Sequence, residues 1–272
     1  MIDDLLQQEI QANMRDQSAG VLYFNDLDSF SLGCAAGRLG KQVILHVFTL
    51  NGAPSRYVES SRETARVMRW RVEVHDINTS IFFEQIRELL SSLNLHRKKD
   101  VAMFYVASEL MQKIGEDITL CSFGLDTLFG LTSSFKRIHR SNAQAFFSLR
   151  QTFLERSGMP ENCVALQPNA STKLFAPYAQ SQVVIKNLLA RNWRELNVND
   201  SDSRVQLKIA IRREFDREIA CIGRIDTHSR AFKSSGLDLL INEIPKNRSI
   251  NFQMRRSLVE ILVDWRLRRS GR

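Results

Sequence analysis

The stretch Val21-Leu22-Tyr23-Phe24-Asn25-Asp26-Leu27-Asp28-Ser29 decides how this chain folds. It is an apolar strand that passes through a short polar loop into a segment of mostly small residues, 30–39. The backbone amides at the start of a helix that follows such a strand point to the same place as the positive end of the helix dipole, and both favour a phosphate group. The stretch therefore predicts an ATP-handling loop whose glycines have been replaced, with Asp28 as a candidate magnesium ligand.

The composition is that of an ordinary globular protein. The chain has 272 residues, of which 43% are apolar and 25% charged, enough for a buried core and for one or two domains. No apolar run approaches the roughly 20 residues that a membrane helix needs, and the start Met1-Ile2-Asp3-Asp4 does not resemble a secretion signal. We therefore expect a cytoplasmic protein without membrane contact. Its four cysteines are widely separated, which favours buried free thiols over disulfides or a zinc site.

Strand-like and helix-like segments alternate after a short polar helix in residues 1–20. The strand candidates are rich in branched or aromatic residues and cover 20–24, 42–50, 71–77 and 117–121. The helix candidates have apolar residues three and four apart and cover 29–39, 60–69, 80–93 and 102–114. This alternation predicts an α/β fold with a doubly wound parallel sheet.

The pattern becomes helical from about residue 134, which predicts two domains. Residues 1–133 are expected to form an α/β nucleotide-binding-like domain, and residues 134–272 a helical lobe packed on it. The formal net charge of +8 is concentrated in 246–272, where basic residues far outnumber acidic ones and apolar side chains recur at helical spacing. We expect a basic C-terminal helix there. It is either a docking helix with a solvated face or a patch for nucleic acid or another polyanion.

A second loop is expected beside the first at the carboxyl edge of the sheet. It is Cys121-Ser122-Phe123-Gly124-Leu125-Asp126-Thr127-Leu128-Phe129-Gly130, directly after the fourth strand candidate. Ligands of open parallel sheets bind at this edge, where the strand order reverses. Asp28 and Asp126 each follow a strand end, and two converging carboxylates are a common way to hold magnesium. Each aspartate taken alone is better explained as a helix N-cap, and their placement at both loops is what favours a metal.

The order of these features resembles the synthetase domain of asparagine synthetases, which are PP-loop ATP pyrophosphatases related to beta-lactam synthetases and lasso-peptide cyclases. The first family motif, S-G-G-L-D-S, is matched by residues 24–29, which keep its L-D-S half. The second, S-G-E-G-A-D-E-L-F-G-G, is matched by residues 121–131, which keep the D-x-L-F-G core. Further segments resemble the helix after the second strand, the R-x-P-F-L-D segment and the K-x-x-L-R helix of the family: 63–68, 174–178 and 208–212. The similarity extends over roughly residues 18–240.

This resemblance implies a site and a reaction. Asp28 and Asp126 would bind Mg²⁺, the first loop would hold the pyrophosphate of ATP, and a carboxylate substrate would be adenylated before an amine displaces AMP. The nucleotide-binding residues implied by position are Leu22, Phe24, Asp28, Ser29, Cys121 and Ser122. Leu22 and Phe24 are equally well explained as core strand residues. No glutaminase domain accompanies the resemblance.

Two departures from the family pattern bear on activity. Asn25 and Asp26 stand where the phosphate loop has glycines, and the carboxylate of Asp26 would repel a pyrophosphate. Asparagine and aspartate tolerate left-handed conformations, so the shape of the loop can persist without its affinity for ATP. The family's R-x-K lysine is matched only by residues 224–226, which hold no lysine, and Lys233 is the nearest substitute.

Three functional hypotheses follow. The first is a diverged, ATP-dependent, amide-forming synthetase. The second is a catalytically lapsed relative that acts as a binding or assembly subunit, with a protein partner or as a homo-oligomer. The third is a nucleic-acid-modifying PP-loop enzyme, indicated only by the basic C-terminus. The five histidines never occur at metal-ligand spacing, which favours structural roles for all of them, including His75 beside Asp76.

Overall fold

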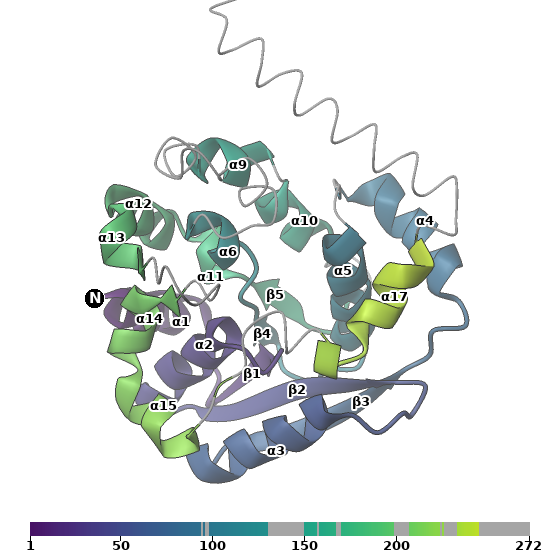
Figure 1. Ribbon diagram of the computed structural model, residues 1–272, viewed down its shortest axis with the longest axis horizontal. Coiled ribbons are helices and arrows are strands. Elements are labelled where there is room, and N and C mark those ends of the chain that lie inside the picture. Colours follow the sequence, from purple (N-terminus) through teal and green to yellow (C-terminus); the bar gives the residue numbers. More distant parts are fainter. Residues whose placement is uncertain are drawn as a thin grey trace, which may run out of the picture.

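The computed structural model describes residues 1–93, 95, 98–129, 150–156, 158–166, 170–198, 207–223, 225 and 233–244. Within these residues a sheet of five parallel strands runs through the molecule in the order β3-β2-β1-β4-β5 (Figure 1). The strands are β1 (Ser18–Leu22), β2 (Gln42–Leu50), β3 (Arg71–Ile77), β4 (Ile118–Leu120) and β5 (Lys173–Phe175). The expected α/β fold with a doubly wound parallel sheet is confirmed.

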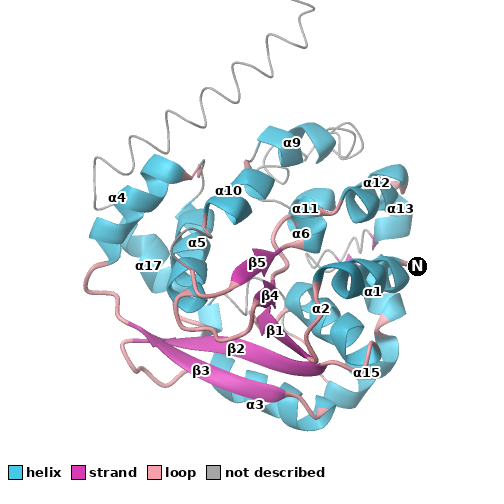
Figure 2. Cartoon of the chain, turned by 180° about the vertical axis from the view of Figure 1, so that it is seen from behind, coloured by secondary structure: helices cyan, strands magenta, loops and turns pink. Residues whose placement is uncertain are grey.

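The strand order reverses at β1, which lies between β2 and β4. The helices α2 (Leu27–Arg38) and α3 (Arg56–Met68) connect β1, β2 and β3 and pack against one face of the sheet (Figures 1 and 2). The chain then returns through α4 (Phe82–Ser92) and α5 (Lys98–Met111) to β4, and α5 packs against β3. Right-handed crossovers put these two pairs of helices on opposite faces of the sheet. The carboxyl ends of β1 and β4 consequently form the switch point at which such sheets bind ligands.

Helix α1 (Ile2–Asn13) precedes the sheet and shows how burial selects the helical segments. Its apolar residues Ile2, Leu6 and Ile10 recur every four positions and are fully buried, so one stripe of the helix faces the core. The helices α2 and α3 are preceded by the N-cap residues Asp26 and Ser55, whose side chains accept hydrogen bonds from backbone amides in the first turn. Periodicity and capping together fix where these helices start and which side they bury.

The rest of the described chain is mainly helical. Its elements are α6 (Leu125–Leu128), α9 (Arg150–Arg156), α10 (Met159–Ala165), α11 (Pro177–Gln180), α12 (Gln182–Ala190), α13 (Trp193–Leu196), α14 (Ile209–Glu214), α15 (Asp216–Ile222) and α17 (Leu237–Glu243), with a short hairpin of β6 (Asn197–Val198) and β7 (Leu207–Lys208). Of these, α6, α9, α11 and α12 pack on one another, α15 packs on α3, and α17 packs on α5. The guanidinium of Arg150 donates to the carbonyl oxygens of Leu128, Leu188, Leu189 and Arg191 and so joins α9 to the ends of α6 and α12. None of the described helices combines the length and apolar character needed to cross a bilayer.

Most expected elements are found, and the differences have simple causes. The strands β2 and β3 have the expected bounds, and β1 ends earlier, at Leu22. Strand β5 is not expected from the sequence, because its three residues are too few to show an alternating pattern. It lies within the expected helical lobe, residues 134–272, yet pairs with β4, so the sheet takes one strand from that part of the chain. The expected basic helix in 246–272 lies outside the described residues.

A charged network ties α1 to the helices that close the fold. Arg38, at the end of α2, donates to the carboxylates of Asp3 and Glu218 at 2.5 and 2.6 Å, and its guanidinium lies 4.8 Å from the centre of the Phe215 ring. The backbone amide of Asp3 donates to Glu214 Oε2 at 2.7 Å. The first helix is therefore held by residues more than two hundred positions later in the chain.

The cysteines largely follow the expectation. Cys34, Cys121 and Cys163 are buried free thiols, whereas Cys221 is exposed. Burial raises the pKa of the Cys34 thiol, so this side chain stays protonated and behaves as a small apolar group.

Candidate functional site at the switch point

The loop after β1 turns sharply into α2, and its own carboxylate caps that helix. Asn25 has φ of 54°, a left-handed conformation that supplies the turn in place of glycine. Asp26 then caps α2, and its Oδ1 accepts from the backbone amide of Ser29 at 3.0 Å and from Ser29 Oγ at 2.7 Å. The Ser29 hydroxyl also accepts from the amide of Phe24 at 3.1 Å. The donors expected to hold a pyrophosphate are thus bonded to a carboxylate of the chain itself.

The two aspartates expected to bind metal are brought together by a lysine. Lys208 Nζ lies 2.7 Å from Asp126 Oδ1 and forms a second, short ion pair with Asp28 Oδ2. Asp28 belongs to the first turn of α2, Asp126 to the first turn of α6, and Lys208 to the end of β7. The Lys208 and Asp28 side chains are buried, at 8% and 7% exposure, while Asp126 is 32% exposed. The carboxylates therefore converge at the switch point from segments far apart in the sequence.

The electrostatics of this triad favour a charged lysine. Burial alone would lower the pKa of Lys208, but the carboxylates of Asp126, Asp28 and Asp26 outweigh this effect and raise the pKa above its usual value. The ammonium of Lys208 lies between the two carboxylates, where a metal cation was expected. This position therefore accepts a positive charge. The oxygen donors of Asp28 and Asp126 also suit Mg²⁺ by their chemistry. The anion position does not fit a pyrophosphate as it stands, because Asp26 occupies it.

The floor of the site is tightly packed. Ser31 Oγ donates to the backbone oxygen of Asp28 at 2.7 Å and lies 2.8 Å from the hydroxyl of Tyr178, a fully buried residue of α11. Gly124, which precedes α6, has φ of 93°, and a Cβ added there would lie 2.9 Å from the backbone oxygen of Tyr178. A side chain at this position would be strained twice, by the backbone angle and by the contact. Gly124 thus allows the second loop to lie directly on α11.

The other residues expected to bind the nucleotide lie around the same edge. Leu22 is fully buried at the end of β1. The ring of Phe24 packs edge to face on that of Phe48, with 6.3 Å between the ring centroids. Cys121 is buried and its amide donates to the backbone oxygen of Phe175 at 2.9 Å, whereas Ser122 is partly exposed. These contacts belong to the core of the sheet, and the nucleotide roles of these residues stay predictions.

Lys208 is the residue of this site that the sequence did not single out. It is the first residue of the segment that resembles the family's K-x-x-L-R helix, and the search for a lysine at the reacting centre looked further along the chain. Lys233, the substitute considered there, is exposed. The sequence signal that could have identified Lys208 is its place as the first residue of segment 208–212, which resembles a helix of the family.

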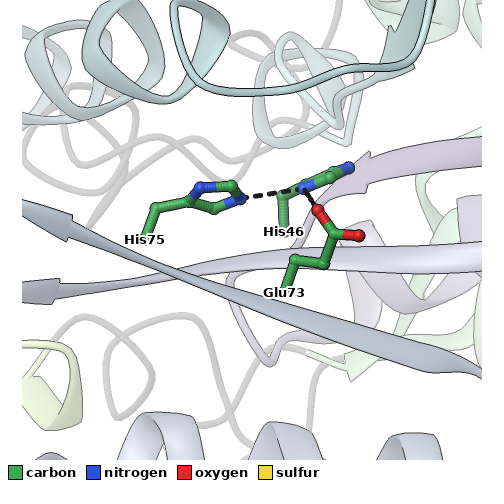
Figure 3. A group of neighbouring side chains, drawn as sticks. All are labelled: His46, Glu73 and His75. Carbon is green, nitrogen blue, oxygen red and sulfur yellow. Dashed lines mark hydrogen bonds and ion pairs between the residues drawn. The ribbon is translucent and has the colours of Figure 1, made fainter.

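A second cluster of titratable side chains lies on the sheet itself, where β2 and β3 pair (Figure 3). His46 Nδ1 lies 3.0 Å from His75 Nε2 and 3.8 Å from Glu73 Oε2. On its other side, His46 Nε2 lies 2.9 Å from Glu116 Oε2. The histidines were expected to have separate structural roles because no ligand spacing links them in the sequence. The strand register, which pairs His46 with Glu73 and Phe48 with His75, brings them together.

Neither a protein-family model nor a curated protein matches this sequence. The resemblance to asparagine synthetase-like proteins therefore stays a prediction that depends on the motif residues. What the described geometry offers on its own is a cation position between two carboxylates and a helix N-terminus that already binds a carboxylate.

Proposed function

We propose that the protein keeps the site geometry of an asparagine synthetase-like PP-loop fold but acts as a binding or assembly subunit that does not split ATP. In this proposal the ammonium of Lys208 takes the place of Mg²⁺ and the carboxylate of Asp26 takes the place of a phosphate. The positions at which an active enzyme would hold ATP and its metal are filled by charges of the chain.

The observation that carries this proposal is the hydrogen bonding of Asp26. One carboxylate oxygen accepts from both the amide and the hydroxyl of Ser29, at 3.0 and 2.7 Å. An incoming pyrophosphate would have to displace this bonded carboxylate from a buried position and would then meet its negative charge nearby. Charge-assisted hydrogen bonds of this kind are among the strong ones in proteins, so the exchange is unfavourable.

A second candidate function is favoured by a different observation. Asp28 and Asp126 converge at the switch point, as an ATP-dependent, amide-forming synthetase requires. There Mg²⁺ would be held by these two carboxylates and would neutralise charge on the phosphates of ATP, with a carboxylic acid as the substrate to be adenylated. Lys208 would then be a positive group already in place near the reacting atoms. The nucleic-acid alternative depends on residues 246–272, outside the described residues.

Calorimetric titration of the full chain with ATP in excess Mg²⁺ separates the two candidates. The proposal expects no binding heat from the folded wild-type protein and no release of pyrophosphate. Saturable binding that is lost in both Asp28→Asn and Asp126→Asn, but kept in the exposed control Asp16→Asn, would overturn the proposal in favour of a synthetase. Circular dichroism of each variant shows whether a lost signal reflects the site or the fold.

A third variant tests the loop itself. Asp26→Gly removes the internal carboxylate and restores the residue type of an active phosphate loop. If Asp26 is what excludes the nucleotide, this variant gains saturable ATP binding that the wild type lacks. Wild-type protein that binds ATP as tightly as Asp26→Gly would show that the carboxylate does not block the site.

A further inference from the structure

The histidine cluster, which we define as His46, Glu73, His75 and Glu116, has the chemistry of a metal site. Nitrogen or oxygen atoms of His46, Glu73 and His75 all lie within 4.8 Å of one another (Figure 3). We propose that it binds a divalent transition metal, Zn²⁺, through His46 Nδ1, His75 Nε2 and Glu73 Oε2, with a water molecule as the fourth ligand. This inference is independent of the function proposed for the switch-point site.

Two ring nitrogens, His46 Nδ1 and His75 Nε2, face each other. His46 is fully buried, with His75 on one side of its ring and Glu116 on the other. A neutral imidazole has one N–H and one lone pair. Because Nε2 faces the carboxylate of Glu116, we assign the proton to Nε2. The lone pair on Nδ1 then points at His75 Nε2, 3.0 Å away.

Glu116 lies on the side of the His46 ring that faces away from the proposed metal and can support the ring there. Histidines that bind metals usually give their other N–H to a carboxylate, which fixes the ring and makes it a better ligand. Glu116 stands in that position, with Oε2 at 2.9 Å from Nε2. Nε2 and Nδ1 lie on opposite sides of the ring, so this pairing leaves Nδ1 to face His75 and Glu73.

The spacing of the donors suits zinc. With Zn–N distances of about 2.0–2.1 Å, neighbouring ligands of a tetrahedral site lie about 3.3 Å apart. The measured spacings of His46 Nδ1 to His75 Nε2 and to Glu73 Oε2 are 3.0 and 3.8 Å. Two imidazoles and one carboxylate are a donor set that zinc favours, and three protein ligands leave one position for water.

The cluster is also reachable. The Glu73 side chain is 37% exposed and His75 is partly exposed, whereas His46 is buried, so two of the three ligands border solvent. Arg71 lies 3.3 Å from Glu73 Oε1 and so leaves Oε2 as the oxygen that faces His46. An ion that enters here would bridge β2 and β3 directly.

The test uses the full chain after its metals have been removed by a chelator and the chelator by dialysis. Zn²⁺ is titrated by calorimetry, and Co²⁺ is added separately because tetrahedral Co²⁺ gives a visible absorption band. We expect one Zn²⁺ per chain and a Co²⁺ band that Zn²⁺ displaces. His75→Ala and Glu73→Gln, at partly exposed positions, should each weaken binding at least 100-fold, with exposed Glu88→Gln as the matched control for the carboxylate.

Glu116→Gln separates a metal site from a hydrogen-bonded group of histidines. Loss of a supporting carboxylate should weaken zinc binding about 10- to 100-fold while one ion per chain is still bound. The absence of saturable binding in the wild type would overturn the proposal. Equal binding in wild type, His75→Ala and Glu73→Gln would do the same, because the ion would then be adventitious and held by other histidines.

Discussion

The switch-point site and the histidine cluster lie on the same sheet but differ in how their charges are balanced. At the switch-point site, which comprises Asp26, Asp28, Ser29, Asp126 and Lys208, carboxylates meet an ammonium and backbone donors at bonding distance. In the histidine cluster, the donor atoms of His46, His75 and Glu73 face one another. Resemblance to a family pointed to the first site, whereas the convergence of these donors points to the second. The switch-point site, to which the family resemblance pointed, already has its charges paired within the chain.

The largest effect that would test this contrast is expected from Lys208→Ala. Removing the ammonium leaves two carboxylates facing each other, and breaking a buried ion pair in this way costs about 3–5 kcal/mol. The partial exposure of Asp126 puts the expected loss in the free energy of unfolding near the lower end, about 3 kcal/mol. Urea denaturation measures it, with exposed Lys186→Ala as control. Addition of Mg²⁺ should restore part of the loss in Lys208→Ala and leave the wild type unchanged.

A somewhat smaller effect is expected from pH in the metal-free protein. The pKa of His46 is about 4 in the folded state against its usual 6.5, so the unfolded chain binds a proton before the folded protein does. The stability that His46 contributes is present above pH 6.5 and is lost as the pH falls toward 4, by about 2–3 kcal/mol. Urea denaturation at a series of pH values measures this loss. A His46→Gln variant with the same pH dependence as wild type would contradict it.

Gly124→Ala tests whether the second loop of the switch-point site must lie on α11. The positive φ and the close approach to Tyr178 predict a loss of about 2 kcal/mol in the free energy of unfolding. Gly115→Ala is the matched control, because no atom lies within 4 Å of a Cβ added there. Thermal and urea unfolding should separate the two variants, and equal stability would mean that the loop can move off α11 freely.

The smallest effect is expected from Tyr178→Phe. The Ser31 hydroxyl donates its proton to the backbone oxygen of Asp28. The Tyr178 hydroxyl is therefore the donor in its hydrogen bond to Ser31. Its removal should cost about 1 kcal/mol. The same substitution in a Ser31→Ala background should cost less, which a double-mutant cycle by urea denaturation measures. Additive costs would show that this bond does not support the loop.

Much of the fold was predictable because the sheet is regular. The strands β2 and β3 are long enough for their branched residues to mark both ends. The convergence of Asp28 and Asp126 was predictable because carboxyl ends of neighbouring parallel strands meet at one edge. These conclusions need only local patterns and the order of elements.

The contacts that depend on pairing between distant residues were not predictable in the same way. Lys208 reaches the aspartates from the two-residue strand β7, which has no period to detect. The meeting of His46 and His75 requires the register of β2 and β3, and a shift by one residue would turn one ring to the other face. The residue types were visible in the sequence, but their neighbours were not.

The network around Arg38 has a consequence for the order of events on the ribosome. Helix α1 packs on α2, which follows it closely, but the bond of Asp3 to Glu214 and the link through Arg38 to Glu218 form only after α14 and α15 have been made. At about 5–20 residues per second, the delay between emergence of the first helix and of its anchors is on the order of ten to forty seconds. During that interval α1 can pack on α2 but lacks its contacts with α12 and α14. The N-terminal part of the fold is thus completed only when its last anchors have left the ribosome.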